Sequence, residues 1–331
     1  MRVVTLRGNI GAIAAVIALS VIALCTAGAA QAQAQDWPRA KPVSIVVGFG
    51  PGAFTDTIAR VVAQKLGETT REAFVVENKP GAGGNIATGQ VKRAPADGYT
   101  ILVHSVAFAV NPSLYPNAGY DALKDFVPLA LGPRTPNIIT VNPATPARDL
   151  KELIELARKD HLSYASSGIG TTTHLSMERL KAAAGVAITH VPYQPAQAIA
   201  AVVAGHTQVS STSMPPAVPQ IRAGKLRAIA VTSAKRSSLL PDVPSVTEFG
   251  YRDFDDYTWV GFFVPAGMPP ALVDRINAEI NRAMETQDAK DRFSQLGMET
   301  SRSSSAEFGV FLRDEVAKWA GVVKSTGAKV E

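Results

Sequence analysis

The sequence predicts an α/β protein of two lobes, with parallel-rich sheets and a hinged cleft between the lobes. Short runs rich in β-branched residues alternate with amphipathic stretches, a pattern typical of parallel sheets covered by helices on both faces. The 331 residues also exceed what one hydrophobic core usually holds, so two lobes are expected. The expected strands are Val43–Val47, Phe74–Glu77, Tyr99–Val103, Ile138–Val141, Leu162–Ala165, Ile188–Val191, Leu226–Thr232 and Trp259–Val264, and the clearest helices are Asp56–Leu66, Leu150–Arg158, His174–Ala184 and Ala196–Ala204.

Two segments are expected to connect the lobes. The proline-rich stretch Gly132–Pro146 is the candidate for the first crossing, and Gly250–Tyr257 for the return. One lobe is then discontinuous, with residues 36–132 plus 256–331 in lobe 1 and residues 133–255 in lobe 2. A cleft between lobes joined by two connections can close like a hinge on a ligand.

The C-terminal tail is predicted to be a helix that begins after the serine run Ser303–Ser305. Apolar residues recur there at helix spacing. A core-facing stripe is favoured over a ligand-binding role for its aromatic residues. The stripe consists of Phe308, Phe311, Leu312, Val316, Trp319 and Val323.

The N-terminus has the composition of an export signal. Arg2 and Arg7 form a positive start, Ile10–Leu24 an apolar run, and the small residues that follow suit cleavage after Ala32 or Ala34. The apolar run is shorter than the roughly 20 residues that a membrane span needs, so a cleaved signal peptide over residues 1–34 is favoured over a retained anchor.

Composition limits the chemistry of the mature chain. Cys25 is the only cysteine and lies inside the signal, so no disulfide and no thiolate metal site are expected. Without the two signal arginines, 31 basic residues face 28 acidic ones. That surplus is too small for a nucleic-acid partner, and no Lys/Arg run is interleaved with aromatic residues. A mildly positive surface does suit small anionic ligands.

The stretch VVGFGPGAFTDTIAR, from Val46 to Arg60, looks at first like a nucleotide-binding loop. It is not G-x-G-x-x-G, however, and no G-K-[ST] follows. Pro51 also removes a backbone donor where a phosphate would need one. Neither a nucleotide nor any other cofactor is therefore expected.

The same stretch can hold a smaller anion. A turn over Gly48–Ala53 leads from a strand into a helix that Thr55 or Asp56 can cap. Backbone N–H groups beside a helix N-terminus bind a small carboxylate, although many such turns only connect elements. The candidate donors are the N–H groups of Gly52, Ala53 and Phe54.

A second strand–loop–helix unit strengthens the prediction of a carboxylate site. In SYASSGIGTTTHLSMERL, a strand ends at Ser166 and Ser167, and the next helix begins through Thr171, Thr172 and Thr173. Hydroxyl groups without a lysine or arginine fit a carboxylate better than a polyphosphate with its metal. Ordinary capping by threonine is the alternative.

A third unit, ILVHSVAFAVNP, places Ser105 just beyond a strand end, where open α/β sheets bind ligands. Catalytic and metal motifs are absent from the sequence. No G-x-S-x-G marks a nucleophile, no H-E-x-x-H marks a metal site, and Asp56 is interpreted as a cap rather than a general base. For His174 and His190, core or capping roles are favoured over metal binding.

Six blocks of the sequence together resemble one family. VVGFGPGAFTDTIAR is similar to the V-P-F-x-P-G-G-x-x-D-x-x-A-R signature of the Bug-type (TctC-like) solute receptors of tripartite tricarboxylate transporters. The family's later blocks are matched in order by VENKPGAGGNIATGQVKRAPADGYTIL, YASSGIGTTTHL, THVPYQ, AGKLRAIAVTSAKRSSLLPDVPSVTEFG and WVGFFVPAGMPP. The resemblance covers the chain from about Pro42 to the C-terminus.

The resemblance implies a two-lobed periplasmic binding protein of the Venus-flytrap type, monomeric, without a cofactor, that passes a small carboxylate to membrane subunits. In the family, two strand–helix loops hold a ligand carboxylate, partly through ordered water. Carried over to this sequence, the first loop corresponds to Phe49 and Pro51–Asp56, and the second to Ser166–Thr173. Ser105 and Tyr193 would line the cleft.

The sequence also departs from the family pattern. Gly48 and Ala53 stand where the family usually has proline and glycine, and Gln194-Pro195 replaces the commoner Lys-Gly. After Val209, the segment SSTSMPP replaces one that is often acidic. These changes lower the charge around the far end of the cleft, which favours a less charged or aromatic-tolerant ligand.

Two other functions stay open on the sequence alone. One is an α/β enzyme acting on a carboxylate, which would convert its ligand to product. The other is a receptor that signals to a membrane sensor without a transport role. The identity of the carboxylate cannot be derived, because backbone N–H groups recognise any carboxylate.

Overall fold

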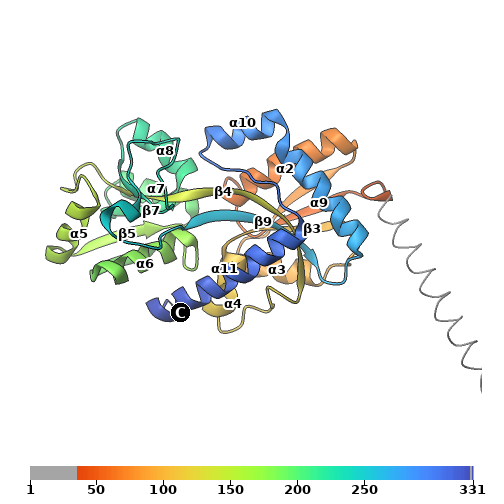
Figure 1. Cartoon of the computed structure of the whole chain (residues 1–331), viewed down its shortest axis with the longest axis horizontal. Coiled ribbons are helices and arrows are strands. Elements are labelled where there is room, and N and C mark those ends of the chain that lie inside the picture. The colour runs from red at the N-terminus through yellow and green to blue at the C-terminus, as the bar shows by residue number, and fades with distance from the viewer. Residues whose placement is uncertain (1–35, 329, 331) are drawn as a thin grey trace, which may run out of the picture.

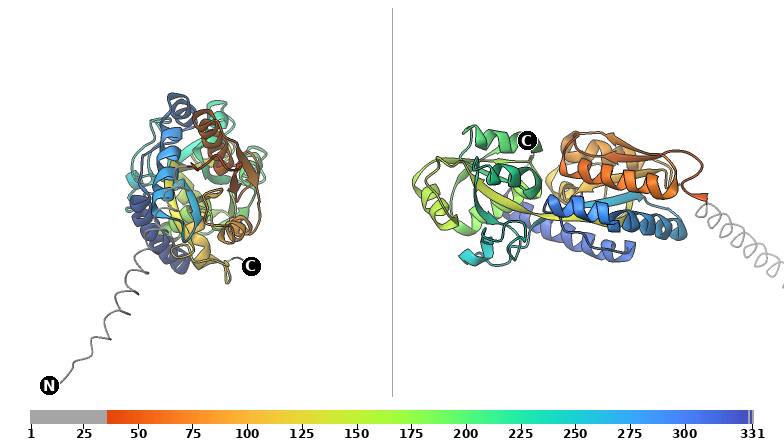
Figure 2. Two further views of the ribbon diagram at one scale, coloured as in Figure 1. Left: turned by 90° about the vertical axis from the view of Figure 1, so that its right-hand side faces the viewer. Right: turned by 90° about the horizontal axis from the view of Figure 1, so that it is seen from above.

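The computed structural model describes residues 36–328 and residue 330, arranged as two groups of helices and strands along the long axis of the molecule (Figure 1). The expected signal segment, with Cys25 and both cleavage positions, lies outside the described residues. The right-hand view of Figure 2 shows the same two groups from above, with extended strands passing from one to the other.

The first group is built on strands whose order is β2-β1-β3-β9-β4. Strand β1 (Val43–Val47) pairs in parallel with β2 (Phe74–Asn78) and β3 (Thr100–Ser105). Strand β9 (Tyr257–Pro265) is antiparallel to β3.

The second group is built around β5 (Leu162–Ser166), which pairs in parallel with β6 (Ile188–Pro192) and β7 (Val209–Ser213). Strand β4 (Phe126–Val141) is antiparallel to β7, to β8 (Arg227–Val231) and to β9. The fold is therefore a mixed α/β fold: its outer pairings are parallel as expected, whereas the pairings of the shared strands β4 and β9 are antiparallel.

Helices cover both faces of each group. On the first sheet, Ile45 packs on the side of α2, α9 and α10, and Val46 on the side of α3, α4 and α11. Burial on both faces explains the nearly continuous apolar run of β1. The helices are α2 (Phe54–Thr70), α3 (Asn85–Lys92), α4 (Ala107–Leu114), α5 (Leu150–Lys159), α6 (Thr172–Ala184), α7 (Pro195–Val203), α8 (Met214–Arg222), α9 (Pro270–Glu285), α10 (Gln287–Gln295) and α11 (Ser305–Thr326), with short 3₁₀ turns at Ala82–Gly84 and Val246–Phe249.

Strand β4 is much longer than the sequence predicted. Within the proline-rich segment expected to cross between the lobes, the sequence predicted a strand only over Ile138–Val141, and prolines have no N–H to donate to a ladder. Pro128 and Pro133 instead lie at two irregularities of the β4–β9 register, and the strand continues through Pro136 to Val141. The lobe boundaries proposed at residues 132/133 and 255/256 stay predictions.

The C-terminal helix is confirmed as α11. Ser304 caps it, since its hydroxyl accepts from the Glu307 N–H while the Glu307 carboxylate accepts from the Ser304 N–H. Phe308, Leu312 and Trp319 are buried against the first sheet. No described helix combines the length and the apolar character needed to cross a membrane.

Candidate ligand-binding site

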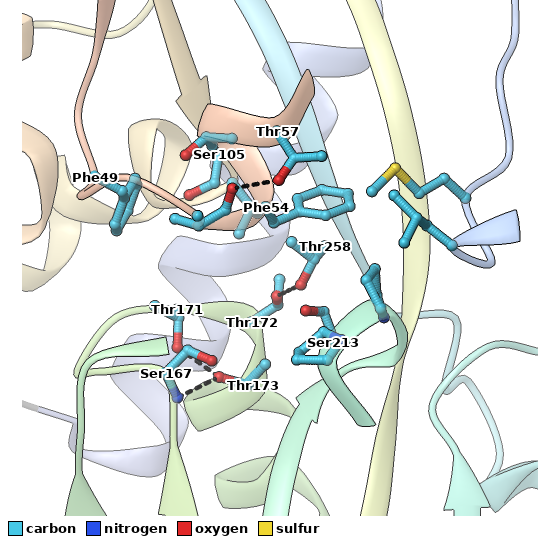
Figure 3. Close-up of a pocket in the computed structure, with 18 residues that line it drawn as sticks. Phe49, Phe54, Thr57, Ser105, Ser167, Thr171, Thr172, Thr173, Ser213 and Thr258 are labelled. Atoms are coloured by element: carbon cyan, nitrogen blue, oxygen red, sulfur yellow. Dashed lines mark hydrogen bonds between the residues drawn. The ribbon is translucent and has the colours of Figure 1, made fainter. Parts of the chain in front are cut away.

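A cavity of about 290 Å³ lies between the two groups of elements and is lined by 18 residues (Figure 3). The lining comes from the β1–α2, β3–α4, β5–α6 and β7–α8 connections, from β9 and from the segment after α10. Eight of the expected site residues line this cavity: Phe49, Gly52, Ala53, Phe54, Ser105, Ser167, Thr171 and Thr172.

The β1–α2 loop is shaped by a glycine and a buried carboxylate. Gly52 has a positive φ of 77°, and its N–H donates to Asp56 Oδ2 at 2.8 Å. The Ala53 N–H donates to the Gly50 carbonyl at 3.2 Å. Two of the three N–H groups expected to face a ligand are thus engaged within the turn.

Helix α2 begins at Phe54, two residues earlier than the expected start at Asp56. Its N-cap is Ala53, which makes no side-chain cap bond, so neither Thr55 nor Asp56 is the N-cap. Helix geometry leaves the N–H groups of Phe54, Thr55 and Asp56 without intrahelical partners. The Thr55 side chain is buried, and its Oγ1 has no hydrogen-bond partner among the described residues.

Asp56 does not line the cavity. It is 2% exposed and accepts hydrogen bonds from Arg60 Nε at 3.0 Å and from Asn78 Nδ2 at 2.8 Å. Burial alone would raise the pKa of this carboxyl, but the bonds from Arg60, the Gly52 N–H and Asn78 together lower the pKa below its usual value. Asp56 is therefore an ionised brace that holds the turn, in line with a structural rather than a basic role.

Phe49 and Ser105 stand at the same end of the cavity as the α2 start (Figure 3). The Phe49 ring packs edge-on against His104, with ring centres 5.5 Å apart. The Ser105 Oγ accepts from the Ala107 N–H at 3.3 Å, which leaves its own proton for another acceptor.

The β5–α6 loop is held together by hydroxyl groups. Thr171 is the N-cap of α6, and its Oγ1 donates to the Gly168 carbonyl at 2.7 Å. The Thr173 Oγ1 accepts from the Ser167 N–H at 3.1 Å and lies 2.8 Å from Thr171 Oγ1. Figure 3 shows these side chains grouped below Phe49 and Ser105, across the cavity. The N–H groups of Thr172 and Thr173 remain as helix-start donors.

The Thr172 hydroxyl connects the two groups of elements. It bonds the Thr258 hydroxyl of β9, which in turn donates to Asn137 Oδ1 of β4 at 2.7 Å. Thr172 is fully buried, so its hydroxyl is committed to this link, although the residue lines the cavity.

Ser166 lies behind the loop and outside the cavity lining. Its fully buried Oγ is 2.7 Å from His190 Nε2, and the His190 ring stacks on His174 with centres 4.2 Å apart. Burial lowers the pKa of His174 to about 4 and that of His190 to about 3. Both rings are therefore neutral at pH 7 and support the loop. In the described part of the chain, no three His, Cys, Asp or Glu residues are grouped to hold a metal ion.

Tyr193 lines a second cavity of about 450 Å³ next to the first. The two cavities adjoin at the same loops, because Phe49, Ser167 and Thr171 line both of them. The helix-start residues Phe54 and Thr172 line only the first cavity, which makes it the better anion site.

Ten other residues line the first cavity. Thr55, Val106 and Thr173 lie next to expected site residues, and the remaining seven were missed by sequence reasoning. The prolines after β7 were visible in the SSTSMPP segment. Leu296 and Met298 have no local signal, because only the fold brings the end of α10 to the cleft. The seven are Thr57, Ser213, Pro215, Pro216, Thr258, Leu296 and Met298.

A two-lobed α/β fold with a cavity beside two helix starts defines the class of periplasmic binding proteins. The family described as the tripartite tricarboxylate transporter family receptor (TctC) matches residues 58–328. The chain therefore belongs to this receptor family and is of the Bug type, as its sequence blocks predicted.

Named relatives agree with this family assignment. Protein BugT of Bordetella pertussis is 34% identical over 95% of this chain and 98% of its own. The structure of the periplasmic binding protein BugD is 35% identical, with a TM-score of 0.82, over 89% of this chain and 100% of its own.

Two solved relatives hold carboxylates. R. palustris Rpa4515 with adipate is 32% identical, with a TM-score of 0.84, over 89% of this chain and 100% of its own. MatC from Rhodopseudomonas palustris with bound malate is 30% identical, with a TM-score of 0.80, over 86% of this chain and 99% of its own.

Proposed function

We propose that this protein is a periplasmic receptor that captures a small carboxylate and delivers it to the membrane subunits of a tripartite tricarboxylate-type transporter. The observation that carries the proposal is the convergence of two helix starts, α2 and α6, on one cavity. Each start supplies unpaired backbone N–H groups, and the positive end of each helix dipole favours an anion there.

Hydroxyl-bearing residues line the same site. Thr55 and Ser105 both belong to the cavity lining. The Ser105 hydroxyl and the N–H groups at Phe54, Thr172 and Thr173 would complete a carboxylate cradle. Carboxylates bound by two solved relatives support this ligand class.

Binding is favoured over catalysis for this chain. The hydroxyls of Thr171, Thr172 and Thr173 are bonded to one another, to the Gly168 carbonyl or to Thr258, and none has a general base beside it. A nucleophile needs such a base within hydrogen-bond reach. The family and its solved relatives are receptors, which points the same way.

The proposed lobes are residues 36–132 plus 256–331 and residues 133–255, joined through β4 and the start of β9. Closure of these lobes over the ligand would bring the α2 and α6 starts together on one carboxylate. Export of the mature monomer follows from the signal predicted in the sequence.

A ligand screen tests the proposal. Binding to the folded state raises apparent stability by RT ln(1 + [L]/Kd), about 2.7 kcal/mol at a hundredfold excess over Kd. Thermal shifts with mono-, di- and tricarboxylates should therefore identify ligands, and mass spectrometry should recover each ligand unchanged. Conversion of the ligand to product would favour an enzyme. Uptake of the ligand that depends on neighbouring membrane-subunit genes would separate transport from sensing.

A further inference from the structure

The two ends of the first cavity offer a ligand different chemistry, and the difference bears on which carboxylate is bound. Given the carboxylate-binding function proposed above, the question is what the part of the ligand beyond its carboxylate contacts. The starts of α2 and α6, which face each other across the cavity, present N–H groups at one part of it. At the other end, a third helix start, that of α8, lies beside the cavity.

The start of α8 cannot serve an anion as the other two do. Its N-cap is Ser213, and its second and third residues are Pro215 and Pro216, which both line the cavity. Proline has no N–H, so neither residue can donate a hydrogen bond to a ligand. The cavity wall at this helix start is therefore formed by two prolines without N–H groups.

No charge compensates for the missing donors. None of the 18 described residues that line the cavity has a charged side chain. Asp56, the charged residue of the first loop, is turned away and paired with Arg60. A second carboxylate at the α8 end would lose its water without gaining a cationic partner, which is strongly unfavourable.

The remaining lining at this end is apolar or neutral. Phe54, Leu296 and Met298 join the two prolines, and Figure 3 shows the Phe54 ring between Thr57 and Thr258, away from Ser167 and Thr171. The hydroxyls of Thr57 and Thr258 donate to the Ala53 carbonyl and to Asn137. The Ser213 hydroxyl, which bonds no other described residue, can meet one neutral polar group of a ligand.

The volume sets the size of the ligand. A cavity of about 290 Å³ lies at the small end of the range of about 300–1,000 Å³ that is typical of ligand pockets. We propose that the cavity selects a compact monocarboxylate with an uncharged, apolar body, whose carboxylate lies at the α2 and α6 starts and whose body lies against Phe54, Pro215 and Pro216.

Matched ligands test the proposal directly. Hexanoate and adipate have the same chain length and differ in whether the far end is a methyl group or a carboxylate. Benzoate and benzene-1,4-dicarboxylate make an aromatic pair. Calorimetry on the mature protein should give a Kd at least tenfold lower for the monocarboxylate of at least one pair. Equal or tighter binding of both dicarboxylates would overturn the inference while leaving the proposed function intact. Failure of every carboxylate in the wider screen would instead count against the proposed function.

A variant that restores backbone N–H groups at the α8 start tests whether the two prolines cause the preference for a monocarboxylate. Pro215→Ala combined with Pro216→Ala returns two N–H groups to the α8 start, and alanine is a good helix former, so the helix should persist. Adipate affinity should rise about tenfold relative to hexanoate. Pro219 belongs to the same helix but does not line the cavity, so Pro219→Ala is the matched control and should change the affinity for neither ligand. A folded double variant with an unchanged preference would show that the prolines do not set specificity.

Discussion

The β1–α2 and β5–α6 loops stand opposite each other across the cavity and reach a similar result by different means. The first is shaped by a left-handed glycine and one ionised carboxylate, since Gly52 donates to Asp56. The second is shaped by neutral hydroxyls, with Thr171 and Thr173 bonded to each other. Both loops lead into helix starts, Phe54 and Thr172, that line the cavity. The comparison teaches that the side chains shape the loops, whereas the backbone supplies the donors.

Ligand affinity should be more sensitive to a single substitution in the first loop than in the second. Gly52→Val is expected to have the largest effect. A Cβ at Gly52 would meet nothing within 4 Å, so crowding is not the cause. The strain comes from φ of 77°, which a β-branched residue rarely adopts. Strain of about 1–3 kcal/mol that shifts the turn would weaken carboxylate binding by roughly one to two orders of magnitude.

Calorimetry with the ligand found by the screen measures this effect, after circular dichroism confirms the fold. Gly50→Ala is the control, because Gly50 also has open space around a Cβ but no positive φ. It should bind normally. Full affinity in a folded Gly52→Val protein would show that the turn geometry does not matter for binding. ATP should bind to neither protein at micromolar concentration.

Asp56→Asn is expected to have the next largest effect. The change replaces an ionised acceptor of the Gly52 N–H and of Arg60 by a neutral amide. Hydrogen bonds to charged groups contribute about 1.5–3 kcal/mol each, so both the free energy of unfolding and the ligand affinity should fall. Chemical denaturation and calorimetry at pH 7 check the two quantities separately.

The pH dependence of this variant carries further information. The folded protein lowers the pKa of Asp56, so its stabilising contribution is present above the unfolded pKa of about 4 and is lost as the pH falls through the folded value. The stability difference between the two proteins should shrink as the solution is acidified below about pH 4. Asp149→Ala, at the N-cap of α5 away from the cavity, should lower stability by about 1 kcal/mol without changing affinity. The same loss of affinity in both variants would argue against a special role for Asp56.

The sequence predicted the elements better than it predicted their hydrogen bonds. Strand β1 was predicted to the residue, because an apolar β-branched run between turn residues has few alternatives. Strand β4 was cut short at its prolines, since a local pattern cannot show that register irregularities accommodate them. Strand β7 was missed because VSSTS is polar, although all five residues are buried.

For the candidate site, motif reasoning located both loops and eight residues of one cavity. It placed Ser166 and Asp56 at a ligand, whereas both lie behind the loops they support. It also assigned donor roles to Gly52 and Ala53, whose N–H groups are used within the turn. Which donors stay unpaired depends on where a helix begins, and helix starts are predicted from sequence only to within a few residues.

A smaller effect is expected for the hydroxyls of the second loop. Thr173→Val removes the acceptor of the Ser167 N–H, a neutral hydrogen bond worth about 1 kcal/mol. Affinity should fall by about five- to tenfold. Thr172→Val breaks the link to Thr258 and should lower stability more than affinity. Thr189→Val, at an exposed position of β6, is the control. If Thr171→Val, Thr172→Val and Thr173→Val all leave the ligand affinity unchanged, these hydroxyls serve only to cap the helix.

The last expected difference between the loops concerns their acid sensitivity rather than ligand affinity at pH 7. His174 and His190 stack behind the second loop, where burial lowers their pKa values to about 4 and about 3. Glu178 raises the pKa of His174, and Lys181 lowers those of both rings. Unfolded histidines bind protons near pH 6.5 while the folded ones do not, so this contribution to stability is full above that pH and falls as the solution is acidified.

The second loop should therefore lose stability from about pH 6.5 downward, whereas the Asp56 brace of the first loop is lost only below about pH 4. His104, buried behind Phe49 with its pKa lowered to about 4, contributes in the same window as the histidine pair. The double variant His174→Gln/His190→Gln isolates the second loop. Its melting temperature should fall less between pH 7 and pH 5 than that of the unmodified protein, by a few degrees, as differential scanning calorimetry would measure. If the melting temperatures of the two proteins fall equally between pH 7 and pH 5, this histidine pair is protonated alike in the folded and unfolded states.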